Sequence, residues 1–341
     1  MGTVVTLMTL LVVLLSGLTA GLGRESTSAI SDLPTDHLVF SVPASGQKVS
    51  FTESTVTEAQ WRRWSEVPGV TSASPLGITT TKASAGDRTA ALSAFGVLPG
   101  SKLAPEADKI TAGRVVLSRG AADALNAQPG QAVIVAGQRL SVVAVAGDAS
   151  YSHTPVIWTS LTDWQRLTPG SSGGNATIIA LTTTSGADLP SADRQLHTST
   201  VTRAAALSAI GSYTSENGSL QLMRGLLFAI SALVIGAFFT VWTIQRSGDV
   251  AVLKALGATT RYLLRDALGQ ALALLLAGTA IGTGLAAAIG AAAAGSVPFA
   301  LTAGSVLPPA AVMIALGATG AALSIRRITS IDPLTALGSA R

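Results

Sequence analysis

The sequence predicts a membrane protein with four transmembrane α-helices and one extracytoplasmic α+β domain between the first and second helices. Its 341 residues are 48% hydrophobic and only 12% charged, which is too apolar for an ordinary soluble enzyme. Four apolar runs are each about long enough to cross a bilayer. Residues 25–219 hold 13 Lys and Arg against 15 Asp and Glu, so the basic excess lies at the membrane ends.

Residues 1–23 form the first predicted span. Gly2–Leu22 carries no charge and lacks the basic start and the small-residue cleavage site of a secretory signal peptide. We therefore expect a retained helix rather than a cleaved leader. Gly17 and Gly21 are four residues apart, a spacing of small side chains that lets another helix approach closely.

Residues 24–219 are predicted to form the extracytoplasmic α+β domain with a stalk. The strand-like run HLVFSV (37–42) comes first, and TEAQWRRWSE (57–66) follows as a helix with Thr57 at its N-cap. An extended, threonine-rich stretch covers Val70–Thr81, and a further strand is expected over Asp87–Val97.

The second half of this region gives the strongest local pattern. A strand at Arg114–Leu117 and a helix to Leu125 precede two β-rich runs, Ala132–Val135 and Leu140–Val145, joined by a hairpin signal. Another strand is expected over 176–183. Residues 196–220 are compatible with a polar helix, which we expect to be the stalk.

Residues 220–245, 267–294 and 305–325 are the other three predicted spans. The third span has small side chains along one face, at Gly278, Gly282, Ala286 and Gly290. Such a face favours close packing against another helix. The loop 295–304 has no Lys or Arg and is expected outside, whereas the tail 326–341 begins with two arginines and is expected inside. The prediction is a multi-pass plasma-membrane protein with both termini in the cytoplasm.

Residues 246–266, between the second and third spans, form the predicted cytoplasmic loop, because it is rich in Lys and Arg. Val250, Leu253 and Leu256 recur at helical spacing, which predicts a short amphipathic helix at the membrane surface. Gly257 offers an end for this helix, and Thr259 or Thr260 offers an N-cap for the next one.

The loop sequence RSGDVAVLKALGATTR (246–261) resembles the cytoplasmic loop of FtsX/MacB-type ABC transporter permeases. The resemblance implies that the loop docks on a separate ATPase as a coupling helix, whose residues here are Asp249, Val250, Leu253, Lys254, Leu256 and Gly257. It also implies a homodimeric permease, with ATP and Mg²⁺ bound by the partner ATPase. The sequence has no GxxxxGK[ST] motif of its own, so we expect a non-catalytic membrane subunit with no bound cofactor.

Two further stretches extend this resemblance. Gly113–Asp148 is similar to the core domain of MacB-like permeases, and SIDPLTAL (330–337) is similar to the family's common ending. The resemblance also implies an amphipathic, arginine-rich segment before the first span, whereas the sequence from Met1 starts with the apolar run.

A partial resemblance to Gram-positive heme-exporter permeases rests on SGLTAGL (16–22) and on the modest outer domain. It implies that heme, as a substrate, binds laterally between the first two spans. Because a thioether and a carboxylate are suitable ligands, Met8, Met223 and Glu25 are candidate substrate residues. Packing in the core or against lipid is the alternative interpretation of the two methionines.

The predicted function is efflux of a hydrophobic or amphipathic substrate. The alternatives are an FtsX-like mechanotransmitter that regulates a cell-wall hydrolase, and extraction of lipoproteins or lipids. A membrane-anchored sensor or hydrolase would leave the four spans and the coupling loop unexplained. The segment Gly170-x-Ser172-x-Gly174 precedes a strand rather than a helix, which disfavours a nucleophile elbow.

Metal and nucleic-acid binding are also disfavoured. His37, His153 and His197 are scattered and lack the spacing of metal ligands. The sequence shows no basic face on a folded domain, which nucleic-acid binding requires. The expected partners are therefore the bilayer, the ATPase and a second copy of the chain.

Overall fold

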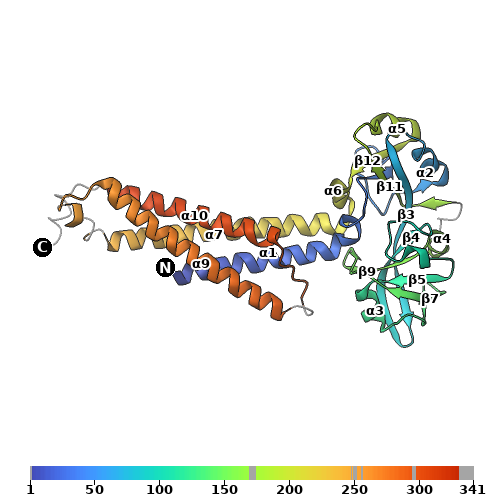
Figure 1. Ribbon diagram of the computed structural model, residues 1–341, viewed down its shortest axis with the longest axis horizontal. Helices are drawn as coiled ribbons and strands as arrows, with labels where there is room; N and C mark the ends of the chain where they lie inside the picture. The colour runs from blue at the N-terminus through green and yellow to red at the C-terminus, as the bar shows by residue number, and fades with distance from the viewer. Residues whose placement is uncertain are drawn as a thin grey trace. The chain divides into compact units, whose positions relative to one another are not determined.

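In a computed structural model of the chain, residues 2–168, 174–246, 248, 252–254, 256–293 and 297–329 are described. The chain divides into two compact units. One comprises Met1–Leu22 with Gly218–Arg341, and the other comprises Gly23–Asn217. The first unit consists of long helices, and the second is an α+β domain (Figure 1).

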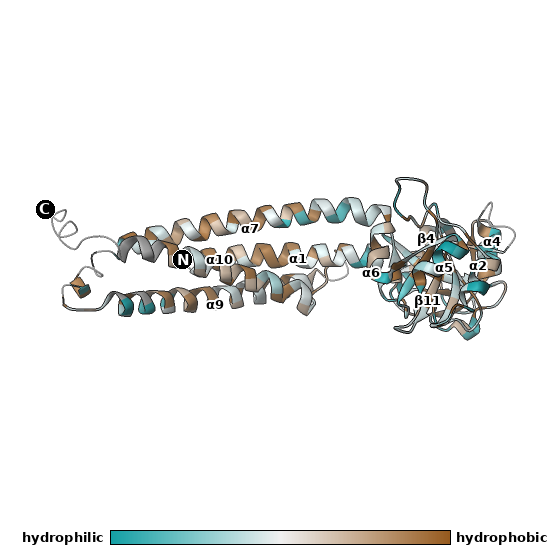
Figure 2. Ribbon diagram, turned by 90° about the horizontal axis from the view of Figure 1, so that it is seen from above, coloured by the Kyte–Doolittle hydropathy of each residue, from teal (hydrophilic) through white to brown (hydrophobic). Residues whose placement is uncertain are grey.

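The helical unit is built from α1 (Gly2–Ser31), α7 (Gly211–Gln245), α9 (Thr260–Ala292) and α10 (Ala303–Thr329). Within the described residues, each of these four helices contains a stretch long and apolar enough to cross a membrane. Figure 2 shows apolar residues along α7 and α9. The chain is therefore a multi-pass membrane protein, as predicted.

Buried apolar side chains from all four helices hold the helical unit together: Val5, Val12, Ile235, Phe239, Ala271, Leu275, Met313 and Ala321. Glycines allow close approach between helices. A Cβ atom added at Gly320 of α10 would lie 3.4 Å from Gly236 Cα of α7, and one added at Gly317 would overlap the side chain of Leu275. Small residues thus let α10 pack closely on α7 and α9.

The helix α9 begins before the predicted third span. Thr259 is its N-cap, and its hydroxyl accepts a hydrogen bond from the Tyr262 backbone N–H, as one of the two predicted caps requires. Just before it, Gly257 has a φ of +95°, a conformation that glycine adopts without steric cost. The start of α9 at Thr260 therefore follows from local sequence.

The α+β domain contains the following elements in chain order: β1 (His37–Ser41), β2 (Val56–Thr57), α2 (Glu58–Trp64), β3 (Val70–Ala85), β4 (Arg88–Val97), η1 (Ala107–Lys109), β5 (Arg114–Leu117), α3 (Arg119–Leu125), β6 (Ala132–Val135), β7 (Gln138–Val145), β8 (Ser150–Tyr151), β9 (Thr154–Ser160), α4 (Leu161–Leu167), β10 (Asn175–Ala176), β11 (Ile178–Thr183), α5 (Leu189–Leu196), β12 (Thr198–Thr202), α6 (Arg203–Ala206) and η2 (Leu207–Ala209).

The described strands form a mixed ten-stranded sheet and a small pair, β10 with β2. The order along the sheet is β12-β1-β11-β3-β4-β9-β5-β7-β6, and β8 pairs with β9. β4 pairs with β9 and β5 with β7 in parallel, whereas the remaining pairs are antiparallel. The prediction of an α+β domain with a partly antiparallel sheet is confirmed.

Both faces of the sheet are buried. Along β11, Ile179 and Leu181 enter a core with α2–α5, whereas Ile178 and Ala180 enter a second core on the opposite face. Ile30, from the end of α1, belongs to this second core. This burial explains why α1 continues past residue 23, the predicted end of the first span, to Ser31.

Most predicted elements of the domain are confirmed. Thr57 forms a capping box with Gln60 at the start of α2, and β5, α3 and β6 have the predicted bounds. The hairpin between β6 and β7 is tighter than expected, because the turn consists only of Ala136 and Gly137, with φ of +45° and +84°.

The prediction of one helix over residues 196–220 is wrong. Thr198–Thr202 forms β12, which pairs along its whole length with β1, and α7 begins only at Gly211. The run TSTVT is rich in β-branched residues, which favour strands where a partner strand is available. Pairing with a distant strand therefore outweighs the helical pattern.

Candidate functional site

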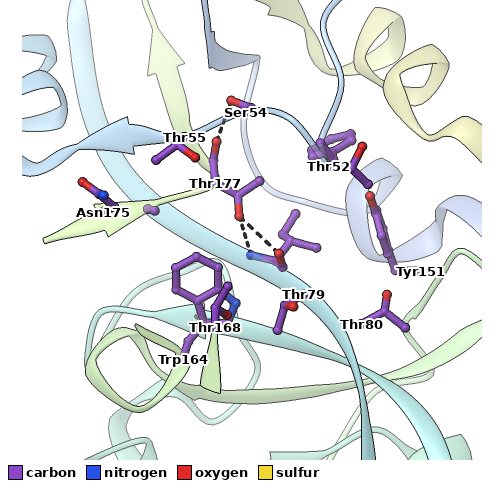
Figure 3. Close-up of a pocket in the computed structure, with 13 residues that line it drawn as sticks. Thr52, Ser54, Thr55, Thr79, Thr80, Tyr151, Trp164, Thr168, Asn175 and Thr177 are labelled. Atoms are coloured by element: carbon purple, nitrogen blue, oxygen red, sulfur yellow. Dashed lines mark hydrogen bonds between the residues drawn. The ribbon is translucent and has the colours of Figure 1, made fainter. Parts of the chain in front are cut away.

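A cavity of about 490 Å³ opens in the α+β domain. Strand β3 forms one wall through Ile78, Thr79 and Thr80, and residues 51–52, 54–55 and 175–177 approach from other segments. In Figure 3, Trp164 and Thr168 of the α4 segment lie on one side, and Tyr151 and Thr52 lie on another. The lining therefore combines segments that are far apart in the sequence.

Some of the lining hydroxyls hold the walls together. Ser54 Oγ donates to the Thr177 carbonyl at 2.7 Å and accepts from the Ser41 N–H at 3.0 Å. Thr177 Oγ1 accepts from the Ile78 N–H at 2.8 Å (Figure 3). These two side chains join β3 to the segments that face it, so their hydrogen-bonding capacity serves the fold.

Tyr151 closes one end of the cavity with an aromatic cluster. Its ring lies 5.8 Å from Phe51 and 5.8 Å from Phe95, centroid to centroid and edge to face in both cases. Burial raises the pKa of the Tyr151 phenol well above its ordinary value of 10.0. The phenol therefore stays protonated in the folded domain where an exposed tyrosine ionises.

This shift predicts a loss of stability in alkali. Above pH of about 10 the unfolded chain releases the phenolic proton while the folded domain keeps it, so the free energy of unfolding falls as pH rises. We expect Tyr151→Phe to show a smaller fall between pH 9 and 11 than the wild type, in thermal melts of the purified chain. Equal falls would contradict a buried phenol.

The turn between β8 and β9 binds the ends of two long helices. Ser152 and His153 form this two-residue turn with φ of +50° and +62°, which costs non-glycine residues about 1–2 kcal/mol each. The Ser152 N–H donates to the carbonyl of Ser26 on α1 at 3.0 Å. The His153 N–H donates to the carbonyl of Glu25, also on α1, at 3.3 Å. The surrounding contacts hold the strained turn in place.

Side chains of the same turn reach both helices. His153 Nε2 lies 2.7 Å from Glu216 Oε2 on α7 and 2.8 Å from Ser26 Oγ on α1. Its Nδ1 lies 3.7 Å from Glu25 Oε2, and Ser152 Oγ lies 2.9 Å from Ser212 Oγ. We call these six residues the helix clamp. It ties α1 and α7 to the turn that follows Tyr151.

The predicted coupling residues are only partly described. Asp249 and Val250 lie outside the described residues. Residues 252–254 are helical, Leu253 and Leu256 are 45% and 79% exposed, and Gly257 follows with positive φ. Lys254 is half-buried. The segment thus presents large apolar side chains to its surroundings.

The predicted packing residues lie at close contacts within the helical unit. On α9, Gly278 faces Val5, and Gly282 faces Thr6 and Thr9 of α1; Ala286 and Gly290 are buried as well. Gly17 and Gly21 of α1 receive the loop before α10 rather than another helix. Phe299 lies against Gly17, Pro298 lies against Gly21, and the Ala300 N–H donates to the Gly17 carbonyl at 3.0 Å.

The three candidate substrate residues have different local surroundings. Met8 is partly buried, and its sulfur accepts a hydrogen bond from Ser231 Oγ at 3.7 Å. Met223 is 48% exposed and precedes Ser231 by eight residues, roughly 12 Å along the axis of α7. Glu25 belongs to the helix clamp. Met8 of α1 therefore lies beside Ser231, about two turns of α7 away from Met223.

The other candidates from the sequence are separate from one another. His37 Nδ1 lies 3.4 Å from Thr183 Oγ1, His153 is in the helix clamp, and His197 is the C-cap of α5. Among the described residues, no cluster of metal-ligating side chains is found. Gly170 and Ser172 lie outside the described residues.

The cavity and the helix clamp are structural features that the sequence did not predict. Their residues come from segments separated by up to 191 positions, from Glu25 to Glu216. A partial signal was present, since the turn Tyr151-Ser-His-Thr carries polar residues without the glycine that such turns favour.

Two family domains together match most of the chain. Residues 4–199 match the MacB-like periplasmic core domain, and residues 222–333 match the FtsX-like permease C-terminal domain. The first match covers more than half of the chain, and the second includes the loop between α7 and α9.

Individual relatives agree with these matches. HrtB of Staphylococcus epidermidis, whose name provisionally assigns it to a hemin transport system as the permease, is 28% identical over 197 residues, 58% of this chain and 55% of HrtB. The match between the chain and this relative thus spans about half of the relative's length. An uncharacterized ABC transporter permease of Mycobacterium tuberculosis is 25% identical over 331 residues, 95% of this chain and 90% of the relative.

Among solved structures, the extracellular domain of the ABC-type transporter YknZ from Gram-positive bacteria is 15% identical, with a TM-score of 0.37. The match covers 47% of this chain and 92% of that domain.

Proposed function

Because the chain belongs to the FtsX/MacB-type ABC transporter permeases, we propose that it couples ATP hydrolysis by a separate ATPase to efflux of a hydrophobic or amphipathic substrate. The observation that carries the proposal is the combination of both family domains with exposed Leu253 and Leu256 between α7 and α9. Members of this family act with an ATPase partner. The chain has no P-loop motif, so ATP and Mg²⁺ belong to that partner.

The proposed arrangement in the membrane follows the positive-inside rule. Both termini and the loop 246–266 lie in the cytoplasm, and the α+β domain lies outside, between α1 and α7. The permease acts as a homodimer and catalyses no reaction itself. The exposed apolar side chains of α7, such as Leu226 and Leu233, face lipid or the second copy.

Coupling runs along α7 in this proposal. The helix is continuous from Gly211 to Gln245, and its outer end carries Ser212 and Glu216 of the helix clamp. Closure of the ATPase dimer pushes on the coupling segment, and a shift of α7 relative to α1 strains the Ser152–His153 turn. The domain then changes conformation in step with ATP hydrolysis.

Aspartate at Leu256 tests the coupling role. We expect Leu256→Asp and Leu253→Asp to reduce permease-dependent ATPase activity at least 5-fold, because a charge in an apolar docking contact is left without a partner. The measurement uses the permease and its ATPase reconstituted together in vesicles. Leu256→Met keeps the side chain apolar and is the matched control.

Two outcomes would contradict the coupling role. One is unchanged ATPase activity in the aspartate variants. The other is an equal loss in Leu256→Met, which would indicate a general packing defect at this position rather than an apolar docking contact.

Heme is the substrate to test first, because a relative is named for hemin transport. We expect the full-length protein to bind heme saturably, with a Soret band, and Met223→Leu to weaken binding about 5-fold by removing an exposed thioether. Met8→Leu should have a smaller effect, since the Met8 sulfur is already hydrogen-bonded to Ser231. Heme binding that neither variant changes would exclude both methionines as ligands.

The helix clamp would also serve a mechanotransmitting complex that regulates a cell-wall hydrolase, or one that extracts lipoproteins or lipids. Efflux moves a substrate across the membrane, extraction removes a lipid or lipoprotein from it, and mechanotransmission moves no substrate. ATP-dependent accumulation of heme in inverted vesicles would support efflux. ATPase coupling without accumulation of heme or another amphipathic compound would favour the other two.

A further inference from the structure

We propose that the cavity of the α+β domain binds an uncharged, polyhydroxylated ligand, of which a neutral disaccharide is the representative. The site is independent of the proposed transport function. Its volume of about 490 Å³ lies within the range of small-molecule sites in proteins.

The lining of the cavity is chemically suited to a neutral, polar ligand. None of the described lining residues is charged, and most carry a hydroxyl or amide group. Hydroxyls both donate and accept hydrogen bonds, and so do the hydroxyls of a sugar. A ligand with carboxylates or phosphates would find no cation among these residues, so an anionic ligand such as heme is disfavoured.

Two residues that line the cavity have a polar side-chain atom without a hydrogen-bond partner among the described residues. Trp164 is 3% exposed, and its indole N–H has no partner among the described residues; the same holds for Thr168 Oγ1, one helical turn away. Both residues line the cavity and lie beside each other in Figure 3. Both atoms are shielded from solvent, so a ligand in the cavity reaches them only through a shift of these side chains. A buried polar group without a partner costs about 1–3 kcal/mol, which such a contact offsets.

The polar side chains that line the cavity differ in whether they form hydrogen bonds within the fold. Ser54 and Thr177 are occupied by hydrogen bonds within the fold. Thr55, Thr79 and the amide of Asn175, by contrast, have no side-chain partner in the part of the chain that the structure describes, and all three line the cavity. These three groups are available to a ligand. Phe51 and Tyr151 add apolar surface, against which the apolar face of a sugar ring can pack.

Titration calorimetry of the full-length protein tests the proposal. The protein is held in a detergent without a sugar headgroup, and the probes are N,N′-diacetylchitobiose and maltose, with glucose 6-phosphate and trialanine amide for comparison. We expect at least one neutral disaccharide to bind saturably and independently of salt concentration, because no ion pair contributes.

Variants locate the binding. Thr79→Val and Thr168→Val should each weaken disaccharide binding about 5-fold through loss of one hydrogen bond. The thermal midpoint should stay unchanged in Thr79→Val and should not fall in Thr168→Val, because that change removes a buried hydroxyl without a partner. Thr162→Val, an exposed position of α4 outside the cavity, is the matched control and should bind like the wild type.

Three results would overturn the proposal. They are the absence of disaccharide binding by the folded protein, tighter binding of glucose 6-phosphate or trialanine amide, and equal affinity in all three variants. None of them bears on ATPase coupling, which Leu256→Asp tests separately.

Discussion

Replacing Gly282 by leucine is expected to destabilise the helical unit by about 3 kcal/mol, because α9 then cannot pack closely on α1. A Cβ atom at this position would lie 2.6 Å from the Thr6 carbonyl oxygen and 2.9 Å from Thr9 Cβ. The carbonyl oxygen belongs to a helix backbone, so relief requires the whole of α1 to move. Thermal denaturation of the purified protein, followed by size-exclusion chromatography, measures the effect.

Gly284 provides a matched control two residues further along α9. It is exposed, and apart from the backbone of its own helix and its chain neighbours, no heavy atom of the described residues lies within 4 Å of an added Cβ. Both substitutions raise helix propensity equally, by about 0.8–1 kcal/mol, so this contribution cancels in the comparison. A Gly282→Leu protein as stable as Gly284→Leu would refute the close packing of α9 on α1.

Replacing Trp164 by alanine is expected to lower the free energy of unfolding of the α+β domain by about 3–5 kcal/mol. The side chain is 3% exposed, and it packs over Gly77 of β3 and Gly96 of β4, where a Cβ would overlap it. Chemical denaturation of the full-length protein, read from the remaining tryptophans, measures the loss. Thr162→Ala, on an exposed position of the same helix, should leave the midpoint nearly unchanged.

Gly77 and Gly96 contact different parts of the Trp164 side chain. An added Cβ at Gly77 meets the indole ring, whereas one at Gly96 meets Trp164 Cβ first. In a double-mutant cycle with Trp164→Leu, the cost of Gly77→Ala should therefore fall by about 1–2 kcal/mol, and the cost of Gly96→Ala should change much less. Equal coupling at both glycines would contradict this geometry.

Local signals in the sequence determined much of the secondary structure. The four helices follow from apolar runs of bilayer length, since a helix satisfies all of its backbone groups within the membrane. The capping box at Thr57 and the strand at Arg114–Leu117 depend on neighbouring residues alone. The cytoplasmic placement and the amphipathic helix expected for residues 246–266 rest on charges and apolar spacing, which also require no distant contact.

Only the tertiary structure decided the strand at Thr198–Thr202, which needs β1, about 160 positions earlier, to supply hydrogen bonds. The same holds for the cavity, the helix clamp and the loop that covers Gly17 and Gly21. Polar residues such as His153 gain a role only when folding brings Glu25 and Glu216 beside them. Sequence patterns report propensity and burial over a few turns, whereas these sites arise from packing between segments far apart in the chain.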